Sequence, residues 1–197
     1  MDKFKNKLKW FFTSFIWLGI LLFVLDVISK QIVKNNMNVY DTIWIIPNFL
    51  DIQYVHNSGM AFGLNTGNPV ANAVIFIAIS LIGTAILLFV LIKYWKKLNM
   101  FTRASIMLML TGCVGNLIDR AFYIDANGAH YVVDFIGVEF GSWSFPRFNV
   151  ADSCLVIGVI MLVIYFIYQE IQNNKKEREK EKLTTVKKEE NNENKDE

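Results

Sequence analysis

Two aspartates occupy apolar surroundings in which a carboxylate rarely stands without a role. Asp134 lies among valines and a phenylalanine at 132–135, and Asp152 ends the apolar segment 148–152. Two carboxylates held close together in such a setting cannot both ionise, so the pair keeps one proton. One member can then take a proton from water while the other protonates a scissile carbonyl oxygen. The two residues are candidates for aspartic-protease chemistry.

The sequence offers alternatives for the role of Asp152 and for the nucleophile. Asp152 also suits a structural role, because an aspartate at the start of a helix caps free N–H groups, and spacing alone leaves both roles open. No serine lies in a nucleophile-elbow pattern, and His56 and His130 have no evident nucleophile partner. Cys113 and Cys154 lie inside apolar runs without metal-ligand spacing, which predicts space-filling roles and no metal site.

Further polar residues stand within or beside apolar segments, where an unpaired charge is costly. Asp26 and Lys30 are four residues apart, so on a helix they share a face and could form only a helix-end ion pair. Asp119 and Arg120 could likewise be an interfacial pair. Asn116, one turn earlier, needs hydrogen-bond partners, which predicts a polar network that holds the aspartates in place.

Four long apolar stretches, at about residues 10–25, 70–92, 101–122 and 150–168, must position these groups. Each is near the roughly 20 residues with which a helix crosses a membrane. With 53% hydrophobic residues in 197, the chain is expected to be a mainly α-helical membrane protein. A cleaved signal peptide is the alternative for the first stretch, but no small-residue cleavage site follows it.

Lysine and arginine gather before the first stretch, between the second and third, and after the fourth, which predicts that these segments face the cytoplasm. The remaining connections, about 26–69 and 123–149, then lie outside and carry the candidate polar residues. Residues 41–46 and 50–56 predict a small hairpin, and 131–140 a strand or an irregular segment. The scattered basic residues predict no nucleic-acid binding.

The composition changes at the end of the chain. Residues 1–172 are expected to form the membrane domain, and residues 173–197 are rich in lysine, glutamate and asparagine. Such a segment cannot bury an apolar core, so it is a solvated helix extension or, as we prefer, a disordered cytoplasmic tail.

The candidate residues fall into five motifs that resemble those of the lipoprotein signal peptidase (signal peptidase II) family. The motifs are Asp26-Val27-Ile28-Ser29-Lys30, Asn57-Ser58-Gly59-Met60-Ala61-Phe62-Gly63, Gly112-Cys113-Val114-Gly115-Asn116-Leu117-Ile118-Asp119-Arg120, Val132-Val133-Asp134-Phe135 and Phe148-Asn149-Val150-Ala151-Asp152. One departure is Thr111, where the family commonly has a glycine. It concerns helix packing and no catalytic position.

The resemblance implies four transmembrane helices, a small extracytoplasmic β-cradle and a second outer loop, with both termini cytoplasmic. It implies an aspartic endopeptidase of the bacterial cytoplasmic membrane that removes the signal peptide from diacylglyceryl-modified prolipoproteins, cutting before the lipid-modified cysteine at the outer face. Asp134 and Asp152 carry over as the catalytic pair. The residues that carry over as lining or supporting the site are Asn57, Gly59, Asn116, Arg120, Asn149, Asp26, Lys30 and Asp119.

The same resemblance implies no cofactor or metal. It implies prolipoproteins and membrane lipid as partners, and we expect a monomer. The strongest rival is a transporter or channel component, whose ion-binding groups should lie near the bilayer midplane, often on broken helices in repeated halves. A purely structural subunit is the other alternative, but it would not need both Asp134 and Asp152.

Overall fold

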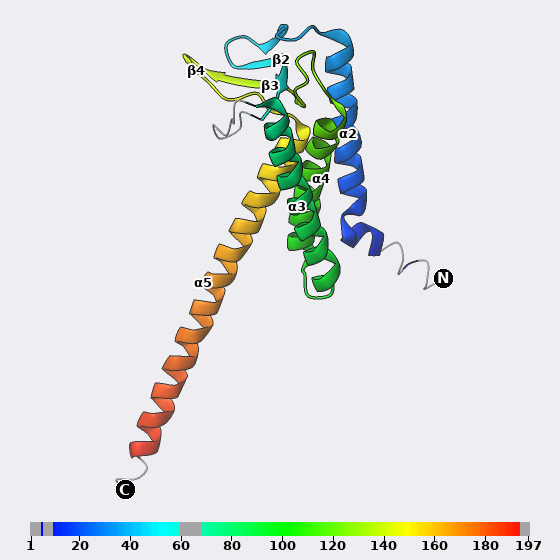
Figure 1. Cartoon of the computed structure of the whole chain (residues 1–197). Helices are drawn as coiled ribbons and strands as arrows, with labels where there is room; N and C mark the ends of the chain where they lie inside the picture. The colour runs from blue at the N-terminus through cyan, green and yellow to red at the C-terminus, as the bar shows by residue number, and fades with distance from the viewer. Residues whose placement is uncertain (1–4, 6–9, 60–67, 194–197) are drawn as a thin grey trace.

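Four long helices and one small sheet make up the computed structural model, which describes residues 5, 10–59 and 68–193. The helices are α2 (Ile16–Asn36), α3 (Pro69–Tyr94), α4 (Met100–Phe122) and α5 (Val150–Glu193). Each is long and apolar enough to cross a membrane. The prediction of four candidate spans is confirmed, and Figure 1 shows α2, α3 and α4 as a bundle from which α5 diverges.

The first helix differs from its predicted bounds. The sequence predicted an apolar stretch at 10–25 followed by an outer connection from residue 26, but α2 continues to Asn36. The charges at Asp26 and Lys30 do not end the helix because both side chains are buried and paired inside the bundle. These two residues therefore lie within a helix, and the first connection begins at Met37.

The sheet joins the two long connections. Strands β1 (Thr42–Ile46) and β2 (Leu50–Asn57) form the predicted hairpin, and β3 (Val132–Phe140) is a strand, followed by the short β4 (Trp143–Ser144). All pairings are antiparallel in the order β1-β2-β3-β4. The pairing of β2 with β3, which the sequence did not predict, joins two segments that lie on either side of α3 and α4 in the chain.

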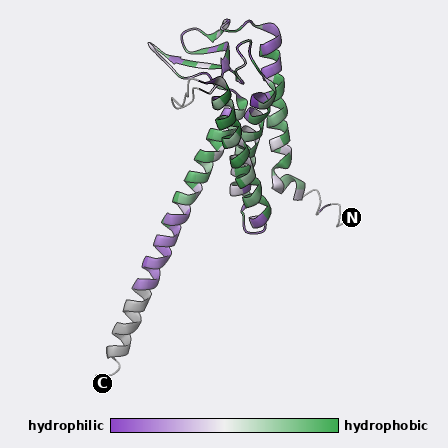
Figure 2. Ribbon diagram, in the orientation of Figure 1, coloured by the Kyte–Doolittle hydropathy of each residue, from purple (hydrophilic) through white to green (hydrophobic). Residues whose placement is uncertain are grey.

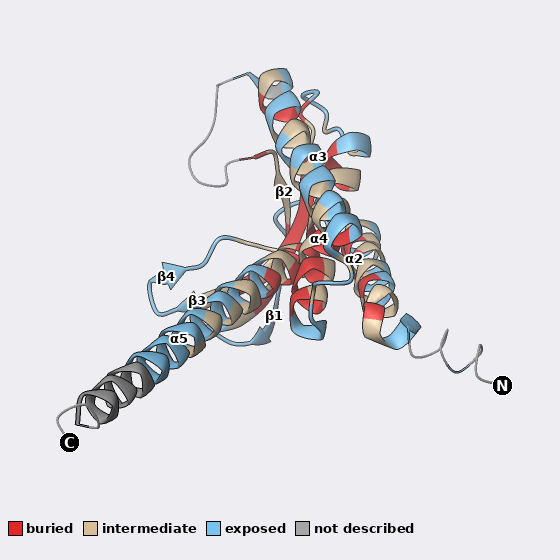
Figure 3. Ribbon diagram, turned by 90° about the horizontal axis from the view of Figure 1, so that it is seen from below, coloured by how far each residue is buried: buried red, intermediate tan, exposed pale blue. Residues whose placement is uncertain are grey.

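The most buried helix is α4. Half of its apolar window is buried inside the protein, against 22% for α2, 17% for α5 and 6% for α3. Figure 2 shows apolar residues along α3 and the first part of α5, and Figure 3 shows that many of these residues are exposed. Exposed apolar surface of this kind suits contact with lipid, with α4 as the centre of the bundle.

Small residues let neighbouring helices approach α4. A Cβ on Gly112 would lie 2.4 Å from the carbonyl oxygen of Ala151 in α5, so only glycine fits there. Thr111 is accommodated beside Gly19 of α2, where an added Cβ would lie 3.3 Å from the Thr111 hydroxyl oxygen. That hydroxyl donates to the carbonyl oxygen of Met107 at 2.9 Å. Gly19 on the facing helix α2 therefore leaves room for Thr111, the residue that departs from the family pattern.

The charged segment after residue 172 differs from the preferred prediction of a disordered tail. In the structure α5 continues without a break through residue 173 to Glu193 (Figure 1). Lysine, arginine and glutamate are good helix formers, and the preceding apolar turns remove the cost of nucleation. The result is the helix extension that was the alternative interpretation.

Candidate active site

The first turn of α5 places Asp152. Asn149, the residue before the helix, accepts the backbone N–H of Asp152 through Oδ1 at 2.9 Å. In return, Asp152 Oδ2 accepts the backbone N–H of Asn149 at 3.1 Å. This is a reciprocal capping box, in which Asp152 is the third helical residue and Asn149 is the cap. The two roles considered for Asp152 are therefore compatible, since its other oxygen, Oδ1, takes part in the polar network.

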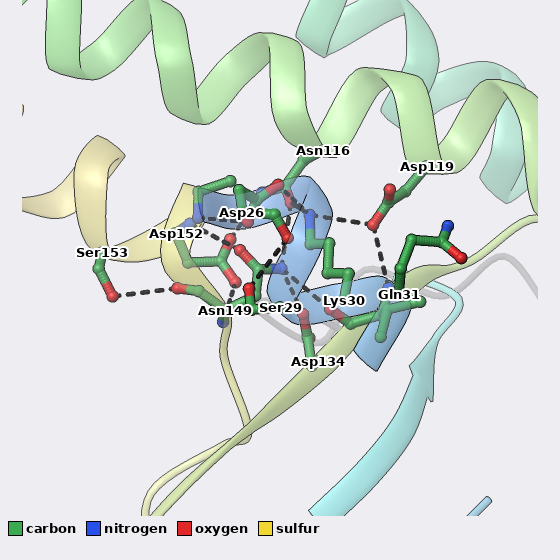
Figure 4. Close-up of polar contacts among 12 residues, drawn as sticks. Asp26, Ser29, Lys30, Gln31, Asn116, Asp119, Asp134, Asn149, Asp152 and Ser153 are labelled. Atoms are coloured by element: carbon green, nitrogen blue, oxygen red, sulfur yellow. Dashed lines mark hydrogen bonds and ion pairs between the residues drawn. The ribbon is translucent and has the colours of Figure 1, made fainter. Parts of the chain in front are cut away.

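Strand β3 places Asp134 opposite this helix start. Its side chain is 1% exposed, and its two oxygens accept amide N–H groups from Asn57 and Asn149, each at 2.7 Å. Asp152 Oδ1 accepts an amide N–H from Asn116 at 2.7 Å. Asn149 also donates to Asn116 Oδ1 at 3.1 Å, so a chain of amides connects the two aspartates (Figure 4).

The surroundings of Asp134 favour its neutral form. Burial, and after it the charge of Asp152, raises the pKa of Asp134 from 3.8 to about 7, although the hydrogen bonds from Asn57 and Asn149 oppose the shift. A carboxylic acid with such a pKa retains its proton near neutral pH. It can therefore donate or accept a proton at the pH at which most enzymes work.

A buried lysine supports both aspartates through two others. Lys30, 1% exposed, has its Nζ 2.7 Å from Asp26 Oδ2 and 3.0 Å from Asp119 Oδ2. Asp26 Oδ1 accepts the backbone N–H of Ala151, the residue before Asp152, at 2.8 Å. Asp119 Oδ2 accepts the backbone N–H of Val133, the residue before Asp134, at 3.2 Å. One cation thus holds, through two carboxylates, the chain beside each candidate catalytic residue.

The two ion pairs considered from the sequence, Asp26 with Lys30 and Asp119 with Arg120, agree only in part with those in the structure. Asp26 and Lys30 do pair, but within a network that also includes Asn116, whose Oδ1 lies 3.3 Å from Lys30 Nζ. Asp119 pairs with Lys30 and not with its neighbour Arg120. The reason is geometric: consecutive residues point to different sides of a helix, whereas Lys30 faces Asp119 from α2.

Arg120 is buried without a carboxylate partner among the described residues. Its guanidinium carbon lies 4.7 Å from the centre of the Phe76 ring in α3. Its Nη1 is buried and makes no hydrogen bond to any of the described residues. The negative charges that act on it most strongly are those of Asp134 and Asp152. Arg120 is therefore a donor near both aspartates with unused capacity.

The loop after β2 orients Asn57. Its Oδ1 accepts the backbone N–H of Gly59 at 3.0 Å, which turns its amide N–H₂ toward Asp134. Gly59 has a φ of 109°, and a Cβ there would lie 2.2 Å from Phe76 Cε2. Only glycine suits this position. The rest of the predicted motif, 60–63, lies outside the described residues.

An open pocket of about 850 Å³ reaches both aspartates. Its lining includes apolar and aromatic side chains, notably Val55, Phe145 and Phe148. The same lining includes Arg147, which the sequence analysis did not select. A lone charged residue among the aromatic residues Trp143, Phe145 and Phe148 was the signal that could have identified it. Within the described residues, no group of three or more His, Cys, Asp or Glu side chains is placed to hold a metal ion.

Residues 18–168 match the family model described as Signal peptidase (SPase) II. The chain belongs to the signal peptidase II family. It is 35% identical to the lipoprotein signal peptidase of Staphylococcus haemolyticus over 161 residues, covering 80% of this chain and 93% of that one. It is 36% identical to that of Fusobacterium nucleatum over 155 residues, covering 78% and 86%.

Solved structures agree with the family assignment. The fold matches a bacterial membrane enzyme structure determined by the in meso method at 2.3 Å, with a TM-score of 0.67 and 32% identity over 80% of this chain and 89% of that one. A second, at 1.9 Å, matches with a TM-score of 0.64 and 34% identity, covering 78% and 92%. The resemblance predicted from the motifs and the fold class are both confirmed.

As a signal peptidase II, the enzyme is an aspartic peptidase that removes signal peptides from prolipoproteins, and it is a bacterial multi-pass membrane protein. The transporter and structural-subunit alternatives are therefore wrong. The polar network lies where α2, α4 and the start of α5 meet the sheet (Figure 4).

Proposed function

We propose that Asp134 and Asp152 are the catalytic dyad of this signal peptidase II. The observation that supports this most directly is that the buried carboxylate of Asp134 and the partly buried carboxylate of Asp152, joined by Asn149 and Asn116, lie in one pocket. The ionised member takes a proton from water, whose oxygen attacks the scissile carbonyl carbon. The protonated member gives its proton to the carbonyl oxygen. The resulting diol collapses as the amide nitrogen gains a proton and leaves.

The neighbouring residues orient this pair. Asn57 and Asn149 direct the oxygens of Asp134, and Asn116 directs Asp152, so each carboxylate has one preferred orientation. Arg120 has an unused donor that suits the substrate's peptide carbonyl group. Gly59 supports the site through the turn that orients Asn57. Lys30, Asp26 and Asp119 support the backbone on which the dyad stands.

The pocket suits a diacylglyceryl-modified prolipoprotein cut before its lipid-modified cysteine. The aromatic side chains of Phe145 and Phe148 give the pocket an apolar wall beside the dyad. Both the signal helix and the acyl chains already lie in the bilayer, so an open apolar pocket at a membrane surface can receive them without extracting them.

We further propose that the dyad works at the outer face of the bacterial cytoplasmic membrane, in a monomer with both termini in the cytoplasm. The sheet lies at the end of the bundle opposite the start of α2 and the end of α5 (Figure 1). Lysines and arginines gather at the terminal segments and between α3 and α4. This orientation predicts that a thiol reagent outside the cell labels Asn127→Cys and not Lys96→Cys, two exposed positions at opposite ends.

The dyad is tested by cleavage of a lipid-modified prolipoprotein with the purified full chain in lipid. Asp134→Asn and Asp152→Asn should each reduce kcat by at least about a thousandfold while remaining folded. Asp41→Asn is the matched control, because Asp41 is exposed in the first connection and, within the described part of the chain, its carboxylate accepts only local N–H groups of Asn38. Near-parental cleavage by either dyad variant would move the catalytic role to other residues.

A further inference from the structure

Arg147 connects the segment before α5 to three strands. Its Nε donates to Gln53 Oε1 in β2 at 3.0 Å, and its Nη1 donates to Ser144 Oγ in β4 at 2.7 Å. Its Nη2 donates to Glu139 Oε1 in β3 at 3.0 Å. All three guanidinium nitrogens are therefore engaged, and these hydrogen bonds reach three different strands.

The same guanidinium neutralises a fully buried carboxylate. Asp51 is 0% exposed, and its Oδ2 lies 3.1 Å from Arg147 Nη2. Among the described residues Arg147 is the one cation that pairs with it. Burial raises the pKa of Asp51, and the positive charge of Arg147 opposes that shift. Without Arg147, the carboxylate would be a buried charge without compensation, which is strongly destabilising.

The chain makes room for this pair. Gly137 of β3 lies opposite Asp51 in the strand register. A Cβ on Gly137 would lie 2.4 Å from Asp51 Oδ1 and 2.6 Å from Arg147 Nε. Any larger residue would collide with both partners. The ion pair is therefore built into the sheet and is not a chance contact between mobile surface chains.

Arg147 also forms part of the pocket wall beside the dyad. The segment 144–148 lines one side of the pocket, and Gln53 and Val55 of β2 line another. Phe148 is held to β3 by backbone hydrogen bonds with Ile136 at 2.8 and 3.1 Å. Asn149, which bonds Asp134, follows directly. The contacts of Arg147 to β2 thus set the distance between the wall 144–148 and the side of the pocket that β2 forms.

We propose that Arg147 is a positioning residue that holds the pocket wall 144–148 against β2 for prolipoprotein binding, with Asp51 as its buried counter-charge. The inference rests on the proposed function, because it takes the pocket at Asp134 and Asp152 as the substrate site. A planar guanidinium reaches Gln53, Ser144 and the carboxylates at fixed angles, which a lysine ammonium cannot do.

The variants separate positioning from stability. In Arg147→Gln, KM for the prolipoprotein should rise about tenfold while kcat changes by no more than about threefold, since Asn149 keeps its own cap and amide bonds. Arg147→Lys should have a KM between that of the parental enzyme and that of Arg147→Gln. In Asp51→Asn with Arg147→Gln, the buried unpaired charge is gone, so thermal stability should recover while KM stays high.

A matched control is Arg103→Gln. Arg103 is also partly buried and donates to a backbone carbonyl, that of Trp95, at 2.8 Å, but it lies at the other end of the bundle. Its loss should leave KM at the parental value. A rise in KM for Arg103→Gln as large as that for Arg147→Gln would overturn the proposal, because general destabilisation would then explain both.

Binding of the intact prolipoprotein to the Asp152→Asn protein provides a readout that does not need turnover. Adding Arg147→Gln to that background should weaken binding about tenfold. Unchanged binding would overturn the role of Arg147 even if the dyad is correct. Cleavage by Asp152→Asn itself would instead overturn the proposed dyad, and the affinity difference would still report on Arg147.

Discussion

Asn149 and Asp152 hold each other at the start of α5, because each accepts the backbone N–H of the other through its side chain. The same two side chains reach into the polar network, Asn149 to Asp134 and Asp152 to Asn116. The position of the proposed dyad is therefore coupled to the start of a helix. A helix cap is a rigid local structure, which suits a group that must be held within a fraction of an ångström.

Replacing Asn149 with serine separates its two roles. A serine hydroxyl preserves the helix cap, but it has no amide to reach Asp134 and Asn116. We expect Asn149→Ser to reduce kcat by about a hundredfold, with little change in thermal stability. Asn149→Ala is the comparison, since it should also lose about 1 kcal/mol of stability with the cap. Parental kcat in the serine variant would show that the amide bridge is not needed.

Removing the charge of Lys30 should destabilise the protein strongly. Lys30→Met leaves Asp26 and Asp119 buried without their cation, at an expected cost of about 3–5 kcal/mol in the free energy of unfolding. Adding Asp119→Asn should recover part of this loss, because one unpaired charge disappears. Both effects can be measured by unfolding in detergent.

The control for Lys30 is Lys34→Met, one turn later on α2. Lys34 Nζ lies 3.8 Å from the centre of the Tyr123 ring, a contact worth about 1 kcal/mol. If Lys34→Met lowered the free energy of unfolding as much as Lys30→Met, the buried network around Lys30 would not contribute more to stability than a surface contact does.

Gly59→Ala tests the orientation of Asn57. An alanine at a φ of 109° is strained by about 1–3 kcal/mol, and its Cβ would collide with Phe76. The turn should shift, so that Asn57 no longer points its amide at Asp134, and kcat should fall at least about tenfold. Gly128→Ala is the matched control: Gly128 has a φ of 77°, but an added Cβ there meets nothing within 4 Å. It should lose some stability and keep its kcat.

The raised pKa of Asp134 predicts how stability and activity depend on pH. The folded protein holds the Asp134 proton up to about pH 7, whereas the unfolded chain releases it near its ordinary value of 3.8. Between these values the folded state binds more protons, so the free energy of unfolding falls as pH rises. The Asp134→Asn variant should lack this part of the slope, and the difference between the two proteins isolates it.

The pH dependence of activity should also reflect the ionisation of Asp134. As the pH rises through about 7, Asp134 loses the proton that the proposed mechanism shares between the two aspartates. A profile of kcat/KM should therefore decline on the alkaline side with an apparent pKa near that value. A profile that stays flat to pH 9 would contradict the assignment of Asp134 as a proton-holding partner.

Much of this protein could be predicted from the order of its residues. Apolar length predicted the four spans, β-forming residues around Pro47 predicted the hairpin, and isolated aspartates in apolar runs indicated the candidate dyad. The spaced motifs indicated the family. These features are local, because a span, a turn or a motif depends on residues that are close in the chain.

The tertiary structure alone decided which distant residues meet. Asn57 and Asp134 are 77 positions apart, and Asp26 and Ala151 are 125 apart. Lys30 pairs with Asp119, and Arg147 with Asp51, through the packing of α2 on α4 and of β3 on β2. Propensity and periodicity carry no information about such partners, because a buried charge can be neutralised by any opposite charge that folding brings within reach. Which one it is depends on how the helices and the sheet pack together.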